Sequence, residues 1–578
     1  MTVDAPPDSR GRRLDSWKEI AAYLDRDVRT VQRWERREAL PVRRLQHTRL
    51  ASVYAYTAEL DQWRAAREPD PGVDDTALQD ARDGKTLWMA ATLAIAVVVL
   101  GLAAWAWQRR TSGPMTDAGP MRTIAVLPIA NFTEDPQQEY FADGMTDALI
   151  ARLSMVPGLL VISRTSVMPF KHSKRRAPEI AKALNADGIV EGSVVRSAGR
   201  VRITIKLIRA RTDTTLWAEV LDRDAHDVLG LQSDVAQAIA RQVASSLSRE
   251  DLGRLAATRP VDPEVFDTYL KGMFLLQKDS RATSEQAMRL FEAATARDPS
   301  FAPAHAGLAR AFNSLGTYFL GGRSPAETLP RAIAAAKEAV RLDPGLPDGH
   351  TQLAYAEQRE WRWRVAEDGY RRAIQLNPSD ATALAQLADL LVCLGRLDEG
   401  IAVVQRARAM DPLSRGTGLV SAMLLYFARQ NDAALRELRT LADLHPDDPR
   451  VLWYLGNSLM VALRFDEAIE MLERSVARER NPGPLGFLTI AYASAGRRPD
   501  AQGVVDELTR MARTSYVPPA AFVAAYTGLG DTDRAFAALE HAYAERSNLM
   551  RSLRVLPVLD PLRQDPRFDE MLRRVGLQ

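Results

Sequence analysis

Cysteine is nearly absent from this sequence of 578 residues, in which Cys393 is the only one. A single thiol cannot close an intrachain disulfide, so a disulfide-stapled scaffold is excluded. Histidine is also scarce, and no two of the seven stand at the i, i+4 spacing of a helical metal site. The P-loop, the G-x-S-x-G elbow and the Rossmann glycine fingerprint are missing as well. We therefore expect no metal, no cofactor and no enzymatic activity.

An excess of either charge is missing too, because 76 lysines and arginines stand against 74 aspartates and glutamates. The hydrophobic fraction of 46% is typical of a folded protein. A chain of this length exceeds what one hydrophobic core can organise. We expect a multidomain protein with a small winged helix-turn-helix, one transmembrane helix, an α/β mixed-sheet domain and an all-α superhelix.

Residues 1–67 are predicted to form a small head with two consecutive helices. Ser16 and Glu19 match a capping box for the first helix, and Asp27 is placed to cap the second. In the second helix, VRTVQRWERR, the inward positions are Val28, Val31 and Trp34. The outward positions are Arg29, Thr30, Gln32, Arg33, Arg36 and Arg37. Such a face suits the major groove of DNA, since arginine reads guanine edges and also grips phosphate.

The stretch PVRRLQHTRLASVYAY, which follows the second helix, predicts a two-stranded wing, and residues 58–66 a closing helix. The candidate DNA contacts near the tip of the wing are Arg43, Arg44, His47 and Arg49. Residues 10–67 hold fourteen lysines and arginines and eight acids, a local excess of six positive charges (14 − 8). That excess is a modest electrostatic footprint for a duplex.

The phrase SWKEIAAYLDRDVRTVQRWERREALPVRRLQH resembles the MerR/excisionase type of winged helix-turn-helix. The resemblance implies a recognition role for Arg29, Thr30, Gln32, Arg33 and Arg36. It implies a wing role for Arg43, Arg44, His47 and Arg49. MerR-type regulators usually continue into a dimerising coiled coil, whereas here an acidic linker follows at residues 68–86. The alternative is a protein-binding module with a solvated arginine face.

Residues 87–107, from Leu87 to Trp107, carry no charge over 21 positions. At about 1.5 Å per residue a helix of this length spans about 30 Å, the hydrocarbon thickness of a bilayer. Trp88, Trp105 and Trp107 stand at its ends, as interfacial tryptophans do. We predict one transmembrane helix here, followed by a linker at residues 108–121. The alternative is a buried core helix, although such helices rarely run so long without a polar face.

The flanking charges leave the orientation open, because basic residues stand on both sides of the span: Arg82 and Lys85 before it, and Arg109, Arg110 and Arg122 after it. We place the amino side in the cytoplasm because it carries the predicted DNA-binding head. That assignment makes the chain a single-pass protein of a bacterial inner membrane with a periplasmic carboxyl-terminal region. The inverted topology is the alternative.

Residues 122–248 predict the order β-α-β-α-β-β-β-α, a mixed sheet covered by helices. The phrases IAVLPIANFTEDPQQEYFADGMTDALIARLS, VISRTSV, EGSVVRSAGRVRITIKLI and TLWAEVLDRD resemble the amino-terminal domain of TolB-like proteins, related to FlgO-type lipoproteins. The resemblance implies an extracytoplasmic binding or assembly module without catalytic residues. Asp143 and Asp147 stand one helical turn apart. They fit a solvated helix start better than an acid–base pair.

Residues 262–578 repeat a pattern with a period of about 34 residues. A small residue recurs at Ala287, Ala332, Ala366, Gly400, Ala434, Ala468, Ala501 and Ala535. Bulky residues follow four positions later at Phe291, Tyr370, Leu438, Leu472 and Leu539. Proline closes many units, at Pro299, Pro344, Pro378, Pro412 and Pro446. This is the tetratricopeptide spacing, and it predicts eight helical pairs with a concave groove for a protein or peptide partner.

The last residues, LPVLDPLRQDPRFDEMLRRVGL, resemble the cap of such arrays, with Phe568, Met571 and Leu572 sealing it. Together these segments predict a membrane-anchored DNA-binding transcriptional regulator with an extracytoplasmic sensor region. Its partners would be double-stranded DNA, the membrane and a protein or peptide, with a homodimer as a further option. The alternative function is an envelope scaffold that recruits partners through its repeats and does not bind DNA.

Overall fold

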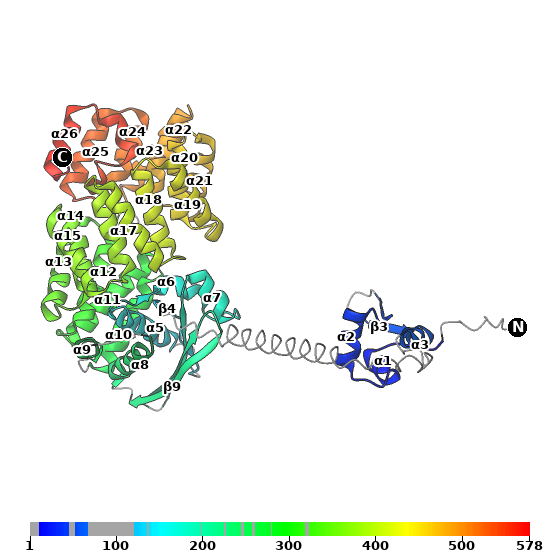
Figure 1. Ribbon diagram of the computed structural model, residues 1–578. Coiled ribbons are helices and arrows are strands. Elements are labelled where there is room, and N and C mark those ends of the chain that lie inside the picture. The colour runs from blue at the N-terminus through cyan, green and yellow to red at the C-terminus, as the bar shows by residue number, and fades with distance from the viewer. Residues whose placement is uncertain are drawn as a thin grey trace, which may run out of the picture. The chain divides into compact units, whose positions relative to one another are not determined.

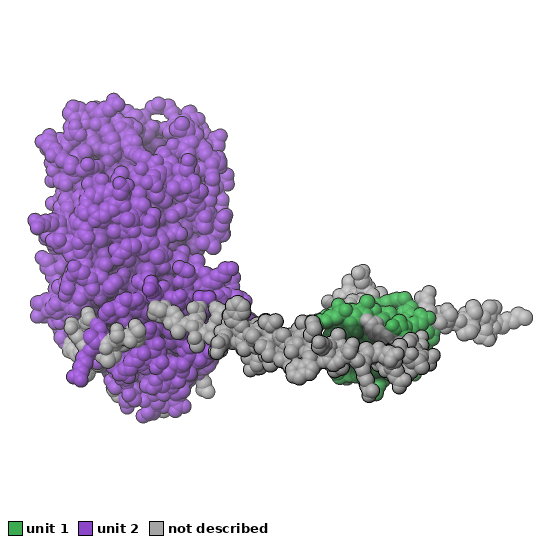
Figure 2. All heavy atoms as spheres, in the orientation of Figure 1, with its two compact units in different colours: residues 1–117 green, residues 118–578 purple. Residues whose placement is uncertain are grey.

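The computed structural model describes residues 11–45, 52–66, 121–133, 135, 138–197, 199–224, 227–243, 248–256, 261–278, 280–317 and 323–578. They belong to two compact units, Met1–Asp117 and Ala118–Gln578, which Figure 2 colours separately. The predicted membrane span at residues 87–107 lies outside the described residues, as do His47 and Arg49. Within the described ranges, no helix is long and apolar enough to cross a bilayer.

The first unit combines three helices with a three-stranded antiparallel sheet of order β1-β3-β2. Its elements are β1 (Arg13–Leu14), α1 (Trp17–Tyr23), α2 (Val28–Glu38), β2 (Arg43–Leu45), β3 (Ser52–Tyr56) and α3 (Thr57–Ala65). Ile20, Val31 and Leu60 have no exposed surface and form the centre of its core. The three predicted helices and the two strands predicted for the wing are present. The additional strand β1 is too short for a periodicity to predict it.

Of the two helix caps predicted in the first unit, the one at Ser16 is altered and the one at Asp27 is as predicted. The Ser16 hydroxyl accepts the backbone N–H of Glu19 at 3.2 Å, as expected. The Glu19 carboxylate, however, accepts the N–H of Asp15 at 3.0 Å, so the capping box is shifted by one residue. Asp27 caps α2 as predicted, and Asp25 supplies the left-handed turn (φ 52°) between the helices.

The second unit begins with a mixed sheet of order β6-β4-β7-β8-β9, with β5 beside β7. The strands are β4 (Thr123–Val126), β5 (Ala130–Asn131), β6 (Leu160–Val161), β7 (Gly188–Ser197), β8 (Arg200–Arg209) and β9 (Thr214–Asp224). The helices are α5 (Glu139–Leu153), α6 (Arg164–Val167), η2 (Met168–Phe170), α7 (Ala177–Leu184), α8 (Val228–Val243) and α9 (Arg249–Ala256). The predicted α/β mixed-sheet domain is confirmed. The short elements β5, α6 and η2 were not predicted.

Helical pairs follow from residue 263 to residue 544 and wind into a superhelix (Figure 1). The first helices of the pairs are α10 (Pro263–Leu276), α12 (Ala302–Leu315), α14 (Pro347–Arg359), α16 (Ala381–Cys393), α18 (Arg415–Phe427), α20 (Pro449–Val461), α22 (Pro482–Ser494) and α24 (Pro519–Leu529). The second helices are α11 (Arg281–Arg297), α13 (Pro325–Leu342), α15 (Trp363–Leu376), α17 (Leu397–Met410), α19 (Asn431–Leu444), α21 (Phe465–Arg478), α23 (Arg498–Met511) and α25 (Thr532–Ala544). The carboxyl-terminal segment adds η4 (Asn548–Ser552), η5 (Pro557–Leu562) and α26 (Pro566–Val575).

The small residues that defined the repeat period are fully buried between paired helices. Seven of the eight are alanines with no exposed surface: Ala287, Ala332, Ala366, Ala434, Ala468, Ala501 and Ala535. At the eighth, Gly400, an added Cβ would lie 2.6 Å from Val392 Cγ2. The helices therefore approach each other as the tetratricopeptide pattern requires, and the predicted superhelix is confirmed.

The α/β domain and the first repeats share one hydrophobic core. The cluster that fills the sheet continues into α10 and α12 through Phe266, Leu270, Phe301 and Ala304. A Cβ at Gly144 of α5 would lie 2.7 Å from Leu270 Cδ2, so α5 and α10 are in direct contact. The boundary predicted between residues 248 and 262 thus separates two parts of one compact unit.

Candidate functional site

The first candidate site is the exposed face of α2 in the first unit. Arg29, Arg33, Arg36 and Arg37 are all exposed. Their i, i+4, i+7 and i+8 spacing places them along one stripe of the helix. Gln32 is half-buried beside them. The site therefore presents a row of cations with one neutral amide, a composition that can contact phosphates and base edges.

The opposite face of α2 packs against the core of the first unit. Val31 is fully buried, while Val28 and Trp34 are half-buried against the same core. The Trp34 and Trp63 rings lie 5.4 Å apart, and the Trp63 indole N–H donates to the carbonyl of Glu38 at 3.0 Å. The packing predicted for α2 is present, so the arginine face has a fixed orientation within the unit.

Two residues predicted to contact DNA, Thr30 and Arg43, form hydrogen bonds with side chains of the first unit itself. The Thr30 hydroxyl donates to Asp27 Oδ2 at 2.6 Å, and this bond, with the Thr30 N–H, lowers the pKa of Asp27. Thr30 thus belongs to the helix cap. Arg43 donates to Glu59 at 2.7 Å, so its charge is partly compensated. Arg44 lies on β2, but its side chain is outside the described part of the chain.

A second candidate site lies where the α/β domain meets the repeats. The carboxylate of Asp411, the cap at the end of α17, accepts the Thr165 hydroxyl at 2.6 Å and the Ser166 hydroxyl at 2.7 Å. The Ser163 N–H donates to the Met410 carbonyl at 2.8 Å. These bonds join α6 to a turn of the superhelix 245 residues later in the chain. The sequence carried no pattern for this contact, because α6 has only four residues.

Beside this contact lies a cavity of about 1070 Å³. Its walls come from α5 and α6 of the α/β domain and from α10, α12, α14 and α16 of the repeats. The charged side chains that line it include Asp147, Arg164, Arg310, Asp348 and Asp380. A cavity of this size between two parts of a fold is typical of a ligand site.

The predicted solvated helix start at Asp143 and Asp147 is instead an ion-pair cluster. Asp143 is buried and binds Lys171 Nζ at 2.5 Å and Arg164 Nη2 at 3.3 Å. Arg164 Nε also contacts Asp147 Oδ1 at 2.5 Å. Burial raises the pKa of Asp147 to about 6, and the Arg164 guanidinium opposes that shift. Asp143 and Asp147 therefore both pair with Arg164 of α6, and Asp143 also pairs with Lys171, which follows η2.

Two further acids of the cavity are bound by neutral groups. Asp348 accepts the side-chain amide of Gln352 at 2.9 Å, and Asp380 accepts the backbone N–H of Ala383 at 3.0 Å as the cap of α16. Burial raises the pKa of Asp380 to about 6, and the nearby Asp348 carboxylate raises it further, whereas Arg310 opposes the shift. Burial also raises the pKa of Tyr269, which lines the same cavity.

The concave groove was predicted to be open for a peptide, but its last four units enclose the chain's own carboxyl-terminal segment. Leu549, Leu556 and Leu559 pack against side chains of α18 and α24. A cavity of about 320 Å³ remains between them, with aromatic walls that include Tyr426 and Trp453. In these units the inner face of the predicted groove is therefore largely filled by the chain itself.

The carboxyl-terminal segment also closes the array against earlier repeats. Arg551 pairs with the buried carboxylate of Asp389 on α16. The Trp363 indole N–H donates to the carbonyl of Val575 at 2.9 Å, 212 residues away. Arg546 stacks 3.8 Å from the centroid of the Trp361 ring. The predicted cap therefore seals the third and fourth units as well as the last one.

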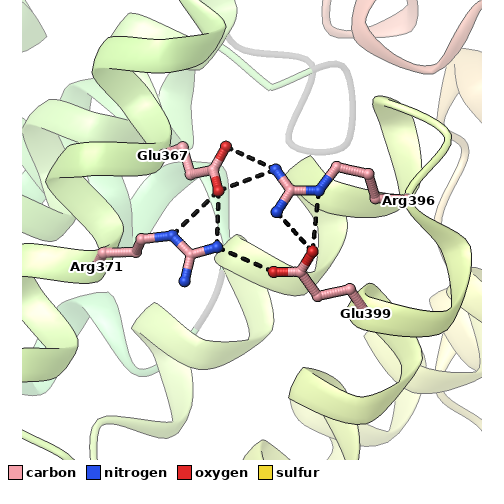
Figure 3. A network of polar contacts seen from close by, with 4 residues as sticks. All are labelled: Glu367, Arg371, Arg396 and Glu399. Atoms are coloured by element: carbon pink, nitrogen blue, oxygen red, sulfur yellow. Dashed lines mark hydrogen bonds and ion pairs between the residues drawn. The ribbon is translucent and has the colours of Figure 1, made fainter.

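A network of ion pairs joins α15 to α17 on the solvent side of the array (Figure 3). Arg371 and Arg396 both bridge Glu367 and Glu399, at distances of 2.5 to 2.9 Å. The Arg396 guanidinium, with Arg371 beside it, lowers the pKa of Glu399. All four side chains are partly exposed, so we expect this network to fix the spacing of two units and to add little stability.

Two family models match parts of the chain. The model described as "Tetratricopeptide repeat" matches residues 351–415 and 419–484. The model described as "HilA/YgeH-like transcriptional regulator, second domain" matches residues 121–240. The second match covers nearly the same residues as the predicted TolB-like domain but gives it the name of a regulator domain. The TolB-like and MerR-like resemblances stay predictions.

A curated relative covers less than half of each chain. It is a Rhizobium meliloti (strain 1021) protein provisionally named adenylate cyclase 3, 34% identical over 254 residues. The alignment spans 44% of this chain and 42% of the relative's own length.

Two solved structures are similar to parts of the chain at low TM-scores. Yeast Tom70 is 14% identical, with coverage of 60% of this chain and 83% of that chain, and a TM-score of 0.34. YrrB, described as a TPR protein with an unusual peptide-binding site, is 17% identical, with coverage of 33% and 93% and a TM-score of 0.24.

Proposed function

We propose that this chain is a membrane-anchored transcriptional regulator that binds double-stranded DNA through its first unit and a partner through its second. The observation that carries the proposal is the exposed row of Arg29, Arg33, Arg36 and Arg37 on a helix whose other face is packed. The regulator-domain match at residues 121–240 and the tetratricopeptide match support it. We assign no catalytic role to either candidate site.

In this proposal the first unit acts as a winged helix-turn-helix of the MerR/excisionase type. Helix α2 enters the major groove, with Arg29, Gln32, Arg33 and Arg36 toward base edges and phosphates. The strands β2 and β3 carry the wing, to which Arg43, Arg44, His47 and Arg49 belong. Thr30 contributes through the cap of α2. Because two half-sites need two heads, a homodimer completes the proposal.

The membrane anchor is the uncharged stretch at residues 87–107. It places the amino terminus in the cytoplasm and the second unit in the periplasm of a bacterial inner membrane, since the head needs access to DNA. Alkaline phosphatase fused after residue 120 should be active in cells, and the same enzyme fused at the amino terminus should be inactive. The reverse pattern would establish the inverted topology and remove the regulator proposal.

DNA binding is tested with the purified full chain in detergent and a pool of random DNA duplexes. We expect selection to enrich a defined sequence, and Arg33→Ala with Arg36→Ala to weaken its binding at least tenfold in a gel shift. Arg64→Ala on α3 is the matched control, because Arg64 is exposed on another helix of the same unit. Equal binding by both variants would contradict the proposal.

The second candidate function is an envelope scaffold that does not bind DNA. The tetratricopeptide match favours it, because such arrays serve as interaction surfaces. Under this alternative, the double arginine variant leaves transcription unchanged in cells, while a variant that unfolds the repeats abolishes the phenotype. A transcriptional defect with the arginine variant would exclude the scaffold function.

A further inference from the structure

Strand β9, Thr214–Asp224, lies at one edge of the mixed sheet (Figure 1). It has 11 residues and pairs with β8 along its length, with one irregularity between Leu207 and Ile208. Among the strands that the structure describes, none pairs with the other side of β9. Proline commonly blocks such edges, and β9 contains none. The backbone N–H and C=O groups on this side can therefore pair with a further strand.

The two faces of β9 have different surroundings. On one face, Trp217 and Leu221 pack against the hydrophobic core of the α/β domain. On the other face, Val220 lies opposite Thr204 of β8 and is 60% exposed. Core packing fixes which side chains of β9 point inward, so a strand that joins this edge must match the same alternation. A second copy of β9 carries that alternation.

Two exposed charges on the core-facing side of β9 restrict the choice of partner strand. Glu219 lies opposite Ile205 of β8, which is buried. Arg223 lies opposite Val201, which is also buried, and forms an exposed ion pair with Asp234 of α8 at 2.7 Å. A charge on this side of an edge strand disfavours pairing with a strand that offers no opposite charge. A second β9 offers an arginine to Glu219 and a glutamate to Arg223.

We propose that two copies of this chain pair through antiparallel β9 strands, about a two-fold axis at Leu221, with Glu219 of each copy opposite Arg223 of the other. Residues at equal distances on either side of the axis lie opposite each other, and both charged residues are two positions from Leu221. Opposite charges in such cross-strand pairs are stabilising. An axis at Glu219 would place two carboxylates opposite each other, and an axis at Val220 would place each Glu219 opposite a leucine.

The paired β9 strands join the sheets of the two copies into one. The inference deepens the proposed function and rests on it in one respect, because the dimer supplies the two heads that two half-sites need. The pairing of the strands does not itself depend on DNA and is measured without it. Its failure and the failure of DNA binding are therefore separate results.

Cysteine cross-linking tests the register in the full chain, purified in detergent. Cys393 is buried and is the only cysteine of the sequence, so an introduced thiol is the only accessible one. Leu221→Cys should give a disulfide-linked dimer on mild oxidation, because residues opposite each other have Cβ atoms about 4.5–5.5 Å apart. Val220→Cys is the matched control, since its two copies lie diagonally, about 7–8 Å apart. No dimer from Leu221→Cys, or more dimer from Val220→Cys, would overturn the proposed register.

Charge reversal tests the pairing without a covalent link. Glu219→Arg places arginines opposite each other and should weaken the dimer at least tenfold in sedimentation velocity, whereas Glu219→Arg with Arg223→Glu should restore it. Lys174→Glu is the control, because Lys174 is exposed elsewhere in the α/β domain. A thermal melt verifies that each variant is folded.

Three results would overturn the proposal: an unsubstituted chain that is monomeric at micromolar concentration, an unchanged dimer in Glu219→Arg, or no recovery in the folded double variant. A dimer that responds to these substitutions as expected but binds no DNA in the gel shift would support this inference and remove the proposed function.

Discussion

Thr165 of α6 donates its hydroxyl to the carboxylate of Asp411, the cap at the end of α17, at 2.6 Å. Asp411 is 4% exposed and also accepts Ser166 at 2.7 Å and Thr417 at 3.0 Å. One buried carboxylate thus satisfies three hydroxyls from two parts of the fold. This relationship ties the α/β domain to the repeats within one compact unit.

We expect Asp411→Ala to destabilise the second unit by about 2–4 kcal/mol, because it removes charge-assisted bonds and leaves buried hydroxyls without an acceptor. Urea unfolding of the purified chain, followed by circular dichroism, measures the change. Asp443→Ala is the matched control, since Asp443 is exposed on α19. An equal effect of the two substitutions would contradict the role assigned to Asp411.

The closure of the repeats should depend on the pair between Arg551 and Asp389. Asp389 is 2% exposed, and its removal leaves the Arg551 guanidinium, 13% exposed, without its anion. We expect Asp389→Ala to cost about 3–5 kcal/mol, as broken buried pairs do. Arg464→Ala, which breaks an exposed pair with Glu467, should cost less than about 1 kcal/mol. Urea unfolding compares the two variants. Similar unfolding midpoints would show that the pair between Arg551 and Asp389 does not stabilise the contact between the carboxyl-terminal segment and the repeats.

The carboxyl of Asp380 should make stability depend on pH. Burial raises its pKa from the ordinary value of 3.8 to about 6, so the folded state binds more protons than the unfolded state between these values. The protonated Asp380 carboxyl therefore contributes to the stability of the folded state at low pH, and this contribution is lost as the pH rises through about 6. Asp380→Asn keeps a good helix cap and should gain up to about 3 kcal/mol relative to the unsubstituted chain between about pH 4 and pH 7. Urea unfolding at several pH values checks this, and a difference that is constant with pH would contradict it.

The arginine row of α2 should be visible in the salt dependence of DNA binding. Each phosphate contact contributes about one unit to the slope of log K against log salt. We expect Arg29→Ala and Arg37→Ala each to reduce the slope by about one, because these residues lie at the two ends of the exposed row. Fluorescence anisotropy at several salt concentrations measures it. A slope unchanged in both variants would show that the row does not contact the DNA backbone.

The local patterns predicted most of the elements. The small-residue period from Ala287 to Ala535 placed the helical pairs, since close helix contact leaves no room for a larger side chain. The order predicted for residues 122–248 has three strands in succession, which are β7, β8 and β9, and β7 pairs with β8 antiparallel. The arginine row was predicted from the inward spacing of Val28, Val31 and Trp34, which the packing of α2 bears out.

Other features were beyond reach because they depend on residues far apart in the chain. The sequence could not place Asp411 beside α6, or Arg551 beside Asp389, since nothing local marks a contact across 162 or more residues. The expected solvation of Asp143 was wrong for the same reason, because Lys171 and Arg164 cover it only after η2 and α6 pack on α5.

The sequence by itself determined the order of elements, the repeat period and the candidate DNA-binding face, because periodicity and capping act within a few residues. Only the tertiary structure decided that the α/β domain and repeats share one core, that the carboxyl-terminal segment fills the groove, and that a charged cavity remains between α5 and the repeats. The second of these features arises from the curvature of the superhelix, which brings the carboxyl-terminal segment onto α15 and α16 and which no single repeat encodes.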